Sequence, residues 1–163
     1  MELKGACHCG GVQFSVHSRH VYPYNRCYCS ICRKTAGGGG YAINLGAINE
    51  TLKVEGMENV SVYQARISDS STNQIKQSPG KRHFCKHCGS ALWVWDPRWP
   101  DLVHPFASAI DSALPAAPQH VHMMLASKAS WVEIEAEWED QLFDEYPKES
   151  LAQWHQRMRL EVD

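Results

Sequence analysis

The stretch Phe84-Cys85-Lys86-His87-Cys88-Gly89 has the form of a zinc knuckle, in which two cysteines separated by two residues are followed by a glycine. The glycine lets the backbone turn so that its amide groups face the sulfur atoms, which stabilises thiolate charge. One knuckle supplies two ligands, so a closed tetrahedral site needs a second pair. The segment Cys7-His8-Cys9-Gly10-Gly11 is the best candidate, because its glycines repeat the same pattern. We therefore expect a structural zinc ion on Cys7, Cys9, Cys85 and Cys88.

The other three cysteines, Cys27, Cys29 and Cys32, lie close enough in the sequence to surround one ion in a single irregular turn. Three thiolates leave one position of a tetrahedral zinc ion for a substrate, as a catalytic site requires. Such an ion is a weaker Lewis acid than one held by three neutral histidines, but it remains thiophilic. The pattern predicts a second, catalytic zinc ion that binds a substrate thiol as thiolate. We expect two zinc ions per chain, with the second site partly occupied.

Three residues beside this triplet are candidates for contacts with the substrate. Tyr28 could donate a hydrogen bond to a metal-bound substrate, although a tyrosine at such a position more commonly packs beneath the loop. Arg33 and Lys34 could bind a carboxylate of a thiol peptide. Together with Arg26 they could also offset the negative charge of three thiolates. The four glycines at 37–40 predict a flexible loop beside them.

Spacing alone leaves two other arrangements of the cysteines open. Cys29 and Cys32 could join the Cys85 knuckle as an ordinary zinc ribbon, which would leave Cys7, Cys9 and Cys27 over. Alternatively, the triplet could be a second closed site whose fourth ligand is a histidine, and both ions would then only support the fold. The possible suppliers of that ligand are His8, His83, His87 and His104.

The length and composition of the chain narrow its class. With 163 residues, of which 44% are hydrophobic and 21% charged, it has the profile of one soluble globular domain over 1–163. A formal net charge of −2 gives no attraction to nucleic acid or anionic lipid, so neither is expected as a partner. No apolar run is long enough to span a bilayer, and residues 1–5 lack the apolar core of a signal peptide. We expect a cytoplasmic protein, where clustered cysteines serve as metal ligands.

Short apolar segments separated by turn residues predict a mostly β chain. Val12, Phe14 and Val16 alternate with polar residues, which is the period of a half-buried strand. Ser150 followed by Gln153 is a capping-box pattern and predicts a short C-terminal helix over about 150–160. Further strands are expected at 41–45, 52–54, 60–65, 74–76, 91–95, 102–107, 120–125 and 131–138, with turns at 68–73 and 78–80.

These motifs resemble those of the glutathione-dependent formaldehyde-activating enzyme family, which also includes centromere protein V. The resemblance covers about 4–135 of this sequence, and its cysteines match in order and spacing. Outside the cysteine motifs it continues at Ile110-Asp111, Pro118, His120 and Trp131. The segments that carry it are Gly5-Ala6-Cys7-His8-Cys9-Gly10-Gly11-Val12-Gln13-Phe14, Cys27-Tyr28-Cys29-Ser30-Ile31-Cys32-Arg33-Lys34 and Arg82-His83-Phe84-Cys85-Lys86-His87-Cys88-Gly89-Ser90.

The resemblance implies a β-tent fold of short antiparallel strands stapled by zinc, and the same division into a structural and an open zinc site. It also implies the family's reaction, in which the thiol of glutathione adds to formaldehyde, formally a carbon–sulfur lyase running in reverse. The expected partners are therefore a small thiol such as glutathione and a small aldehyde. The alternative function is a non-catalytic zinc module that binds protein or nucleic acid, by analogy with centromere protein V. Three features depart from the family pattern: Tyr28, where histidine is frequent, the flexible glycine stretch 37–40, and the polar segment 67–78.

Overall fold

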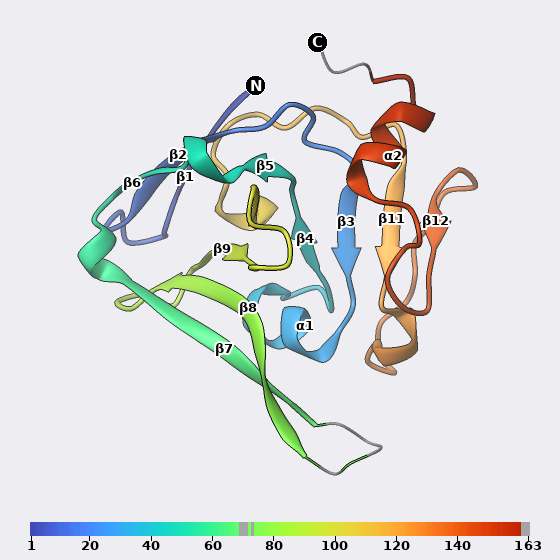
Figure 1. Cartoon of the computed structure of the whole chain (residues 1–163), viewed down its shortest axis with the longest axis horizontal. Coiled ribbons are helices and arrows are strands. Elements are labelled where there is room, and N and C mark those ends of the chain that lie inside the picture. The colour runs from blue at the N-terminus through green and yellow to red at the C-terminus, as the bar shows by residue number, and fades with distance from the viewer. Residues whose placement is uncertain (69–71, 73, 161–163) are drawn as a thin grey trace.

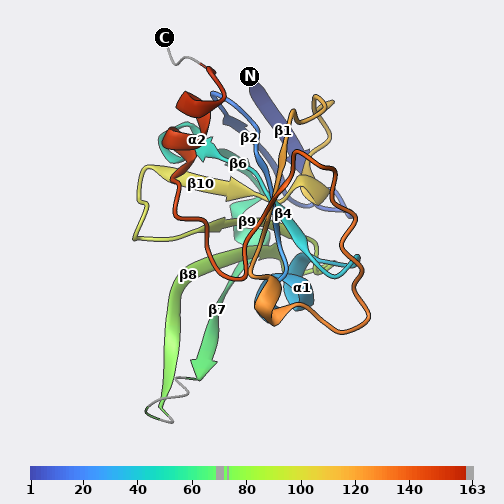
Figure 2. The same cartoon turned by 90° about the vertical axis from the view of Figure 1, so that its right-hand side faces the viewer.

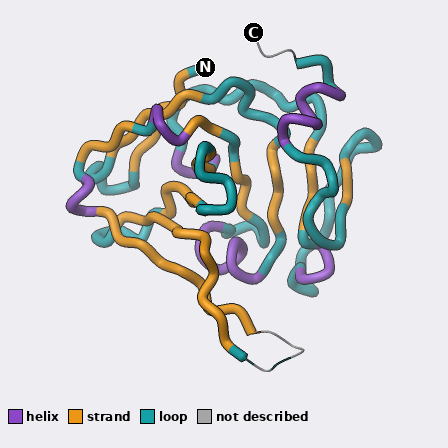
Figure 3. Tube along the Cα trace, in the orientation of Figure 1, coloured by secondary structure: helices purple, strands orange, loops and turns teal. Residues whose placement is uncertain are grey.

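The computed structural model describes residues 1–68, 72 and 74–160 of the chain. Short strands arranged in three sheets make up most of its regular structure (Figure 1, Figure 3). The mostly β fold expected from the sequence is confirmed. None of the helices in the described residues is long and apolar enough to cross a membrane. The first sheet has the order β1-β2-β6 and consists of β1 (Glu2–Ala6), β2 (Gln13–His17) and β6 (Lys53–Glu55).

The second sheet carries the longest strands, and its β7–β8 hairpin extends away from the body of the protein (Figure 1, Figure 2). The turn expected at 78–80 is wrong, because these residues lie inside β8. They are accommodated where the register between the two strands shifts, and such irregularities are where strands tolerate proline. The turn expected at 68–73 falls mainly on 69–71 and 73, outside the described residues. In spatial order the strands are β5 (Ala47–Ile48), β10 (Leu102–Pro105), β9 (Ala91–Trp95), β8 (Ile75–Cys85) and β7 (Val60–Ser68).

The third sheet combines both strand directions. β3 is antiparallel to β4 but parallel to β11, and β11 is parallel to β12, so this sheet adds parallel pairs to the antiparallel strands that the family resemblance implied. The parallel pairs join segments that are far apart in the chain, which a local sequence pattern does not reveal. In spatial order the strands are β12 (Gln141–Leu142), β11 (His120–Met123), β3 (Tyr24–Cys27) and β4 (Ala42–Asn44).

Two α-helices complete the fold. α1 (Ser30–Ala36) was not expected, whereas α2 (Leu151–Arg157) begins after the predicted cap at Ser150 with both hydrogen bonds of a capping box. The strand expected at 131–138 is wrong, since this segment is irregular and pairs with no strand among the described residues. Single turns of 3-10 helix lie at Asn49–Thr51, Met57–Asn59, Ala107–Ala109 and Leu125–Ser127.

The main core lies between the first two sheets. Phe14 and Trp93 meet there edge to face, with ring centroids 5.3 Å apart. A second, smaller cluster contains Cys27, Cys32 and Phe106, with Met123 packed against it. The cysteine triplet therefore lies in an apolar surrounding of its own.

Replacing Ser150 by alanine should lower the free energy of unfolding by about 1 kcal/mol, because the helix loses its N-terminal cap. The side chain of Ser150 accepts a hydrogen bond from the backbone N–H of Gln153 at 3.2 Å. The helix it starts buries Trp154, whose indole N–H donates to Gln119 at 3.1 Å. Urea titration would measure the effect, and a Ser150→Asp variant, which can also cap, should match the wild type.

Candidate metal centres and active site

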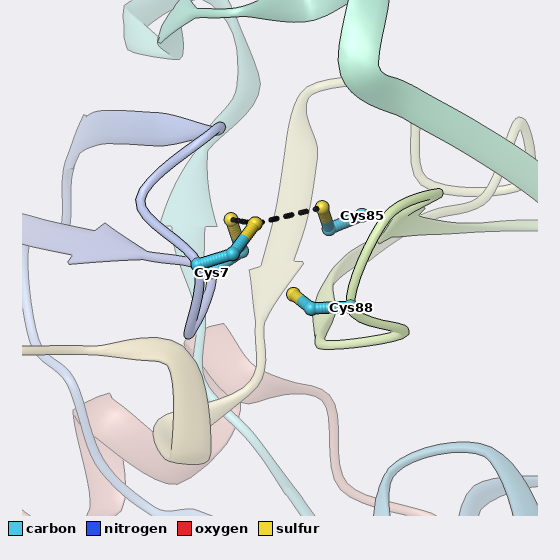
Figure 4. Close-up of side chains that lie close together, drawn as sticks. Cys7, Cys85 and Cys88 are labelled. Atoms are coloured by element: carbon cyan, nitrogen blue, oxygen red, sulfur yellow. Dashed lines mark hydrogen bonds between the residues drawn. The ribbon is translucent and has the colours of Figure 1, made fainter.

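Four cysteines from two distant segments converge at the first candidate metal centre. The sulfur atoms of Cys7 and Cys9 are 3.5 Å apart, and those of Cys9 and Cys85 are 3.7 Å apart. Figure 4 shows the side chains of Cys7, Cys85 and Cys88 directed towards one another. All four sulfur atoms lie within 4.8 Å of one another. Ligands of a tetrahedral zinc at ~2.3 Å are about 3.8 Å apart, so this donor set fits zinc.

Backbone and hydroxyl groups support these thiolates. The N–H of Val12 donates to the sulfur of Cys7 at 3.2 Å. Ser90 links the two knuckles, because its hydroxyl lies 3.2 Å from the sulfur of Cys88 and accepts from the N–H of His8 at 3.0 Å. Hydrogen bonds from the side chain and the backbone of Ser90 lower the pKa of Cys88 to about 5. These contacts link the two pairs and favour the thiolate form of Cys88.

The second centre forms where β3 ends and α1 begins. Cys27 is the last residue of β3, Cys29 is the N-cap of α1, and Cys32 lies in the first turn of that helix. Their three sulfur atoms lie within 4.8 Å of one another, which is the spacing that thiolates on one zinc ion require. Cys27 and Cys32 are buried, whereas Cys29 is partly exposed. The change from strand to helix therefore brings the triplet together and leaves Cys29 as its most exposed member.

The thiols of the triplet do not ionise independently. Hydrogen bonds from Cys27 and then Cys32 lower the pKa of Cys29, and the N–H of Cys32 also donates to its sulfur at 3.3 Å. The interaction with Cys29 raises the pKa of Cys27. Cys29 is therefore the first thiolate of the group, and a bound cation would complete the ionisation of the other two.

None of the four histidines considered as a closing ligand joins the triplet within the described residues. The ring of His104 contacts the carbonyl of Leu45, and His87 contacts the side chain of Asn59. His83 stacks on Trp93, and the backbone of His8 is bound to Ser90. The zinc-ribbon arrangement is also not what the structure shows, since Cys29 and Cys32 lie with Cys27 and not with the Cys85 knuckle.

Two arginines flank the triplet in the sequence, and a third, Arg82, comes near it through the fold. Arg26 directly precedes Cys27, Arg33 directly follows Cys32, and the positive charge of Arg82 opposes the rise in the pKa of Cys32. Each has a buried side-chain N–H without a hydrogen-bond partner among the described residues. Buried donors of this kind are costly and normally find an acceptor. Arg82 was not foreseen, because it comes from β8, some fifty positions along the chain.

The other predicted contact residues have different surroundings. Lys34 is exposed. Tyr28 is 1% exposed, and its hydroxyl lies 2.9 Å from Nδ1 of His122. Burial is the main reason why the pKa of Tyr28 is raised to about 12. Its hydroxyl therefore has a partner inside the protein, and the substrate contact expected for Tyr28 and Lys34 stays a prediction.

In the glycine loop at 37–40, the last position requires glycine for steric reasons. Gly40 has a φ of +93°, and a Cβ atom there would lie 2.3 Å from Cγ2 of Val132. We expect Gly40→Ala to lower the free energy of unfolding by about 2 kcal/mol or more. Gly38→Ala is the matched control, because nothing lies within 4 Å of its Cβ position. Urea titration of both variants would test this, and equal stabilities would contradict it.

A cavity of about 880 Å³ lies elsewhere, beside α2 and β5. Ile48, Leu151 and His155 are among the residues that line it, and none of the cysteines does. The chemistry of the triplet therefore does not take place in this cavity.

A family model described as glutathione-dependent formaldehyde-activating enzyme matches residues 2–127, a span that contains all seven cysteines. The chain belongs to this family. A Halomonas elongata protein that is provisionally named a glutathione-dependent formaldehyde-activating enzyme is 63% identical over 161 residues, which cover 99% of each chain. A Rhodobacter sphaeroides protein of known crystal structure is 27% identical with a TM-score of 0.50, and the match covers 69% of this chain and 91% of that one.

In this member of the formaldehyde-activating family, the segment after the matched span also packs beside the triplet. The N–H groups of Met124 and Leu125 donate to the carbonyls of Glu145 and Phe143, both at 3.1 Å. Tyr146 comes next in the chain, and burial together with the nearby thiols of the triplet raises its pKa. The C-terminal segment thus forms part of the surroundings of the second centre.

Proposed function

We propose that the protein adds the thiol of glutathione to formaldehyde, or cleaves the resulting adduct, and so acts as a carbon–sulfur lyase. The observation that carries this proposal is the gathering of three cysteine sulfur atoms within 4.8 Å at the end of β3. Membership of the family and the printed name of the Halomonas elongata relative support the choice of glutathione and formaldehyde. We propose a catalytic zinc site on Cys27, Cys29 and Cys32, and a structural one on Cys7, Cys9, Cys85 and Cys88.

The reaction needs no oxidant or reductant. The sulfur of the substrate thiol forms a bond to the carbonyl carbon of formaldehyde, and the π electron pair of the carbonyl moves onto its oxygen. The thiol proton ends on that oxygen, so the product is a hydroxymethyl thioether. A zinc ion held by the triplet would favour the thiolate form of the substrate at neutral pH. The chain's own contribution is to hold the two reactants together in a largely apolar surrounding.

The arginines beside the triplet could favour the binding of a thiol peptide over that of a thiol without a carboxylate. Glutathione carries carboxylates, and the guanidinium group is the side chain that binds a carboxylate through two parallel hydrogen bonds. Arg33 and Arg26 flank the triplet in the sequence, and the buried Nε–H of each lacks an acceptor among the described residues, although Nη1 of Arg26 contacts the carbonyl of Glu135 at 3.4 Å. We propose that these groups bind the carboxylates of glutathione while its thiol lies at the triplet.

A direct test follows the exchange between free glutathione and its hydroxymethyl adduct by NMR with ¹³C-labelled formaldehyde. Thiols add to formaldehyde without a catalyst, so the measured quantity is the exchange rate above the rate in buffer. Zinc-loaded protein is expected to raise this rate for glutathione and to leave S-methylglutathione, which has no thiol, unreactive. An exchange rate equal to that in buffer would refute the proposed activity.

Arg33→Gln should raise the KM for glutathione by about 10- to 100-fold, which corresponds to the ~1.5–3 kcal/mol of a hydrogen bond to a charged group. The KM for 2-mercaptoethanol, which has no carboxylate, should not change. Lys53→Gln serves as the matched control, since it removes an exposed positive charge from β6 in another sheet. Equal losses with both thiols would mean that Arg33 does not recognise the carboxylate.

We also propose that the protein works in the cytoplasm. All seven of its cysteines are free, and reducing conditions keep such clusters available as metal ligands. Cell fractionation of the host would test this, and recovery only from an oxidising compartment would contradict it.

A further inference from the structure

A chain of buried hydrogen bonds connects the C-terminal segment to the peptide that carries the triplet. The hydroxyl of Tyr28 lies 2.9 Å from Nδ1 of His122, and Nε2 of His122 lies 3.3 Å from Oδ2 of Asp140. His122 is fully buried, and the side chain of Asp140 is only 3% exposed. Asp140 lies beyond residues 2–127, the span that the family model matches.

The protonation states of Asp140 and His122 determine which group donates in each of these hydrogen bonds. Burial raises the pKa of Asp140, but hydrogen bonds from the backbone N–H groups of His120 and Glu137 outweigh it and hold this pKa below its ordinary value. Burial lowers the pKa of His122, so its ring is neutral. A carboxylate can only accept, so Nε2 of His122 carries the proton and donates to Asp140. Nδ1 is then the acceptor, and the hydroxyl of Tyr28 donates to it.

Asp140 is itself held from several sides. Its Oδ1 accepts from the N–H of His120 at 2.7 Å and lies 3.2 Å from Nδ1 of the same residue. Its Oδ2 accepts from the N–H of Glu137 at 3.1 Å. The next two residues form β12, which pairs with β11 at Val121 and His122. The carboxylate is therefore a fixed point against which the ring of His122 is aligned.

At the other end, Tyr28 stands between two of the proposed metal ligands, Cys27 and Cys29. Its ring lies parallel to that of His122 with centroids 5.8 Å apart, and its N–H donates to the carbonyl of Met123 at 3.0 Å. The side chain and the backbone of Tyr28 are thus both fastened to β11. Because a residue's backbone moves with its side chain, this anchor limits how far the sulfur atoms of Cys27 and Cys29 can separate.

We propose that Asp140, acting through His122 and Tyr28, is a positioning residue for the three-cysteine centre and determines how tightly that centre holds zinc. The proposal rests on the proposed function in one respect, namely that the triplet binds a metal. Hydrogen bonds behind the ligands of other metal sites change affinity by about 10- to 100-fold when they are removed. The same range is expected here, confined to the triplet.

The test measures zinc, not turnover. A graded chelator competition on the full-length, zinc-loaded protein should show two classes of ion, with the triplet releasing its zinc first. Tyr28→Phe removes one hydroxyl and keeps the ring, and Asp140→Asn removes the charge at the far end. Both variants should weaken the first class by about 10- to 100-fold and leave the second class at its wild-type affinity. In the double variant the two effects should not add, because they break one chain.

Tyr24→Phe is the matched control. Tyr24 is the first residue of β3, the strand that ends directly before Tyr28. Its hydroxyl donates to the carbonyl of Pro115, and that contact is exposed. This variant should bind both ions as the wild type does. If Asp140→Asn lowers the thermal midpoint but leaves the affinity of the triplet unchanged, Asp140 merely anchors the C-terminal segment and the inference is wrong. If the wild-type protein binds a single zinc ion, the proposed function fails, and this inference fails with it.

Discussion

A Cys29→Ala variant is expected to lose formaldehyde-adduct turnover by at least about 10³-fold while the protein remains folded. Cys29 is the first thiolate of the triplet and its most exposed member, so its loss leaves two buried thiols that cannot hold a catalytic ion. Several kcal/mol of transition-state stabilisation depend on such an ion, and this is the origin of the expected factor. The NMR exchange rate and the zinc content of the same sample provide the measurement.

Cys29→Ser separates the two roles of this residue. The cysteine also caps α1, because its sulfur accepts from the N–H of Cys32. Serine can still cap the helix, but its hydroxyl is a poor ligand for zinc. Both variants should therefore lose one zinc ion and the activity, while only Cys29→Ala also loses about 1 kcal/mol of stability. Full activity in Cys29→Ser would exclude the triplet as the reactive centre.

Removing a cysteine of the four-cysteine centre should lower the stability of the protein more than any other change considered above. Cys88 is exposed, so replacing it by serine would change stability by less than about 0.5 kcal/mol if no metal were bound. If the four cysteines hold zinc, whose binding is worth roughly 10 kcal/mol or more in small domains, the loss should amount to several kcal/mol. For a chain of this size the thermal midpoint would fall by about 10–20 °C.

Calorimetry of the zinc-loaded wild type and Cys88→Ser, each with and without a strong chelator, measures this effect. The wild type should approach the variant when the chelator is present, and the variant should respond much less. Ser30→Ala, which changes an exposed residue beside the triplet, is a suitable control and should leave the midpoint nearly unchanged. A Cys88→Ser midpoint equal to that of the wild type would show that the four cysteines do not stabilise the fold through a metal.

The local parts of the fold could be predicted from the sequence, because their signals are local. The alternation around Phe14 identified β2, and Ser150 with Gln153 identified the start of α2. The segment 78–80 misled the prediction, since Pro79 and Gly80 usually mark a turn but here lie at an irregularity within a long hairpin. α1 escaped prediction because its N-cap is a cysteine, a residue that does not normally signal a helix start.

For the candidate sites, too, the sequence predicts only what depends on residues close together in the chain. The seven cysteines fall into the two groups that knuckle spacing and the family resemblance indicated, because neighbours in sequence supply most of each group. His122, Asp140 and Arg82 could not be predicted, since each comes from a part of the chain that is distant from the triplet in sequence. No spacing rule connects Asp140 to Tyr28, and the parallel pairing of β11 with both β3 and β12 brings them together.

This mixed sheet also affects how the protein is made. Cys27 leaves the ribosome early, but β11 and β12, which flank it on one side, are synthesised only after most of the chain. Until residues 120–142 emerge, β3 lacks its parallel neighbour, and the thiols beside it have none of the shielding that the finished sheet provides. Contacts between such distant segments form late and slowly during folding. If the triplet binds a metal as proposed, its loading is therefore expected only after residues 120–142 have emerged and paired with β3.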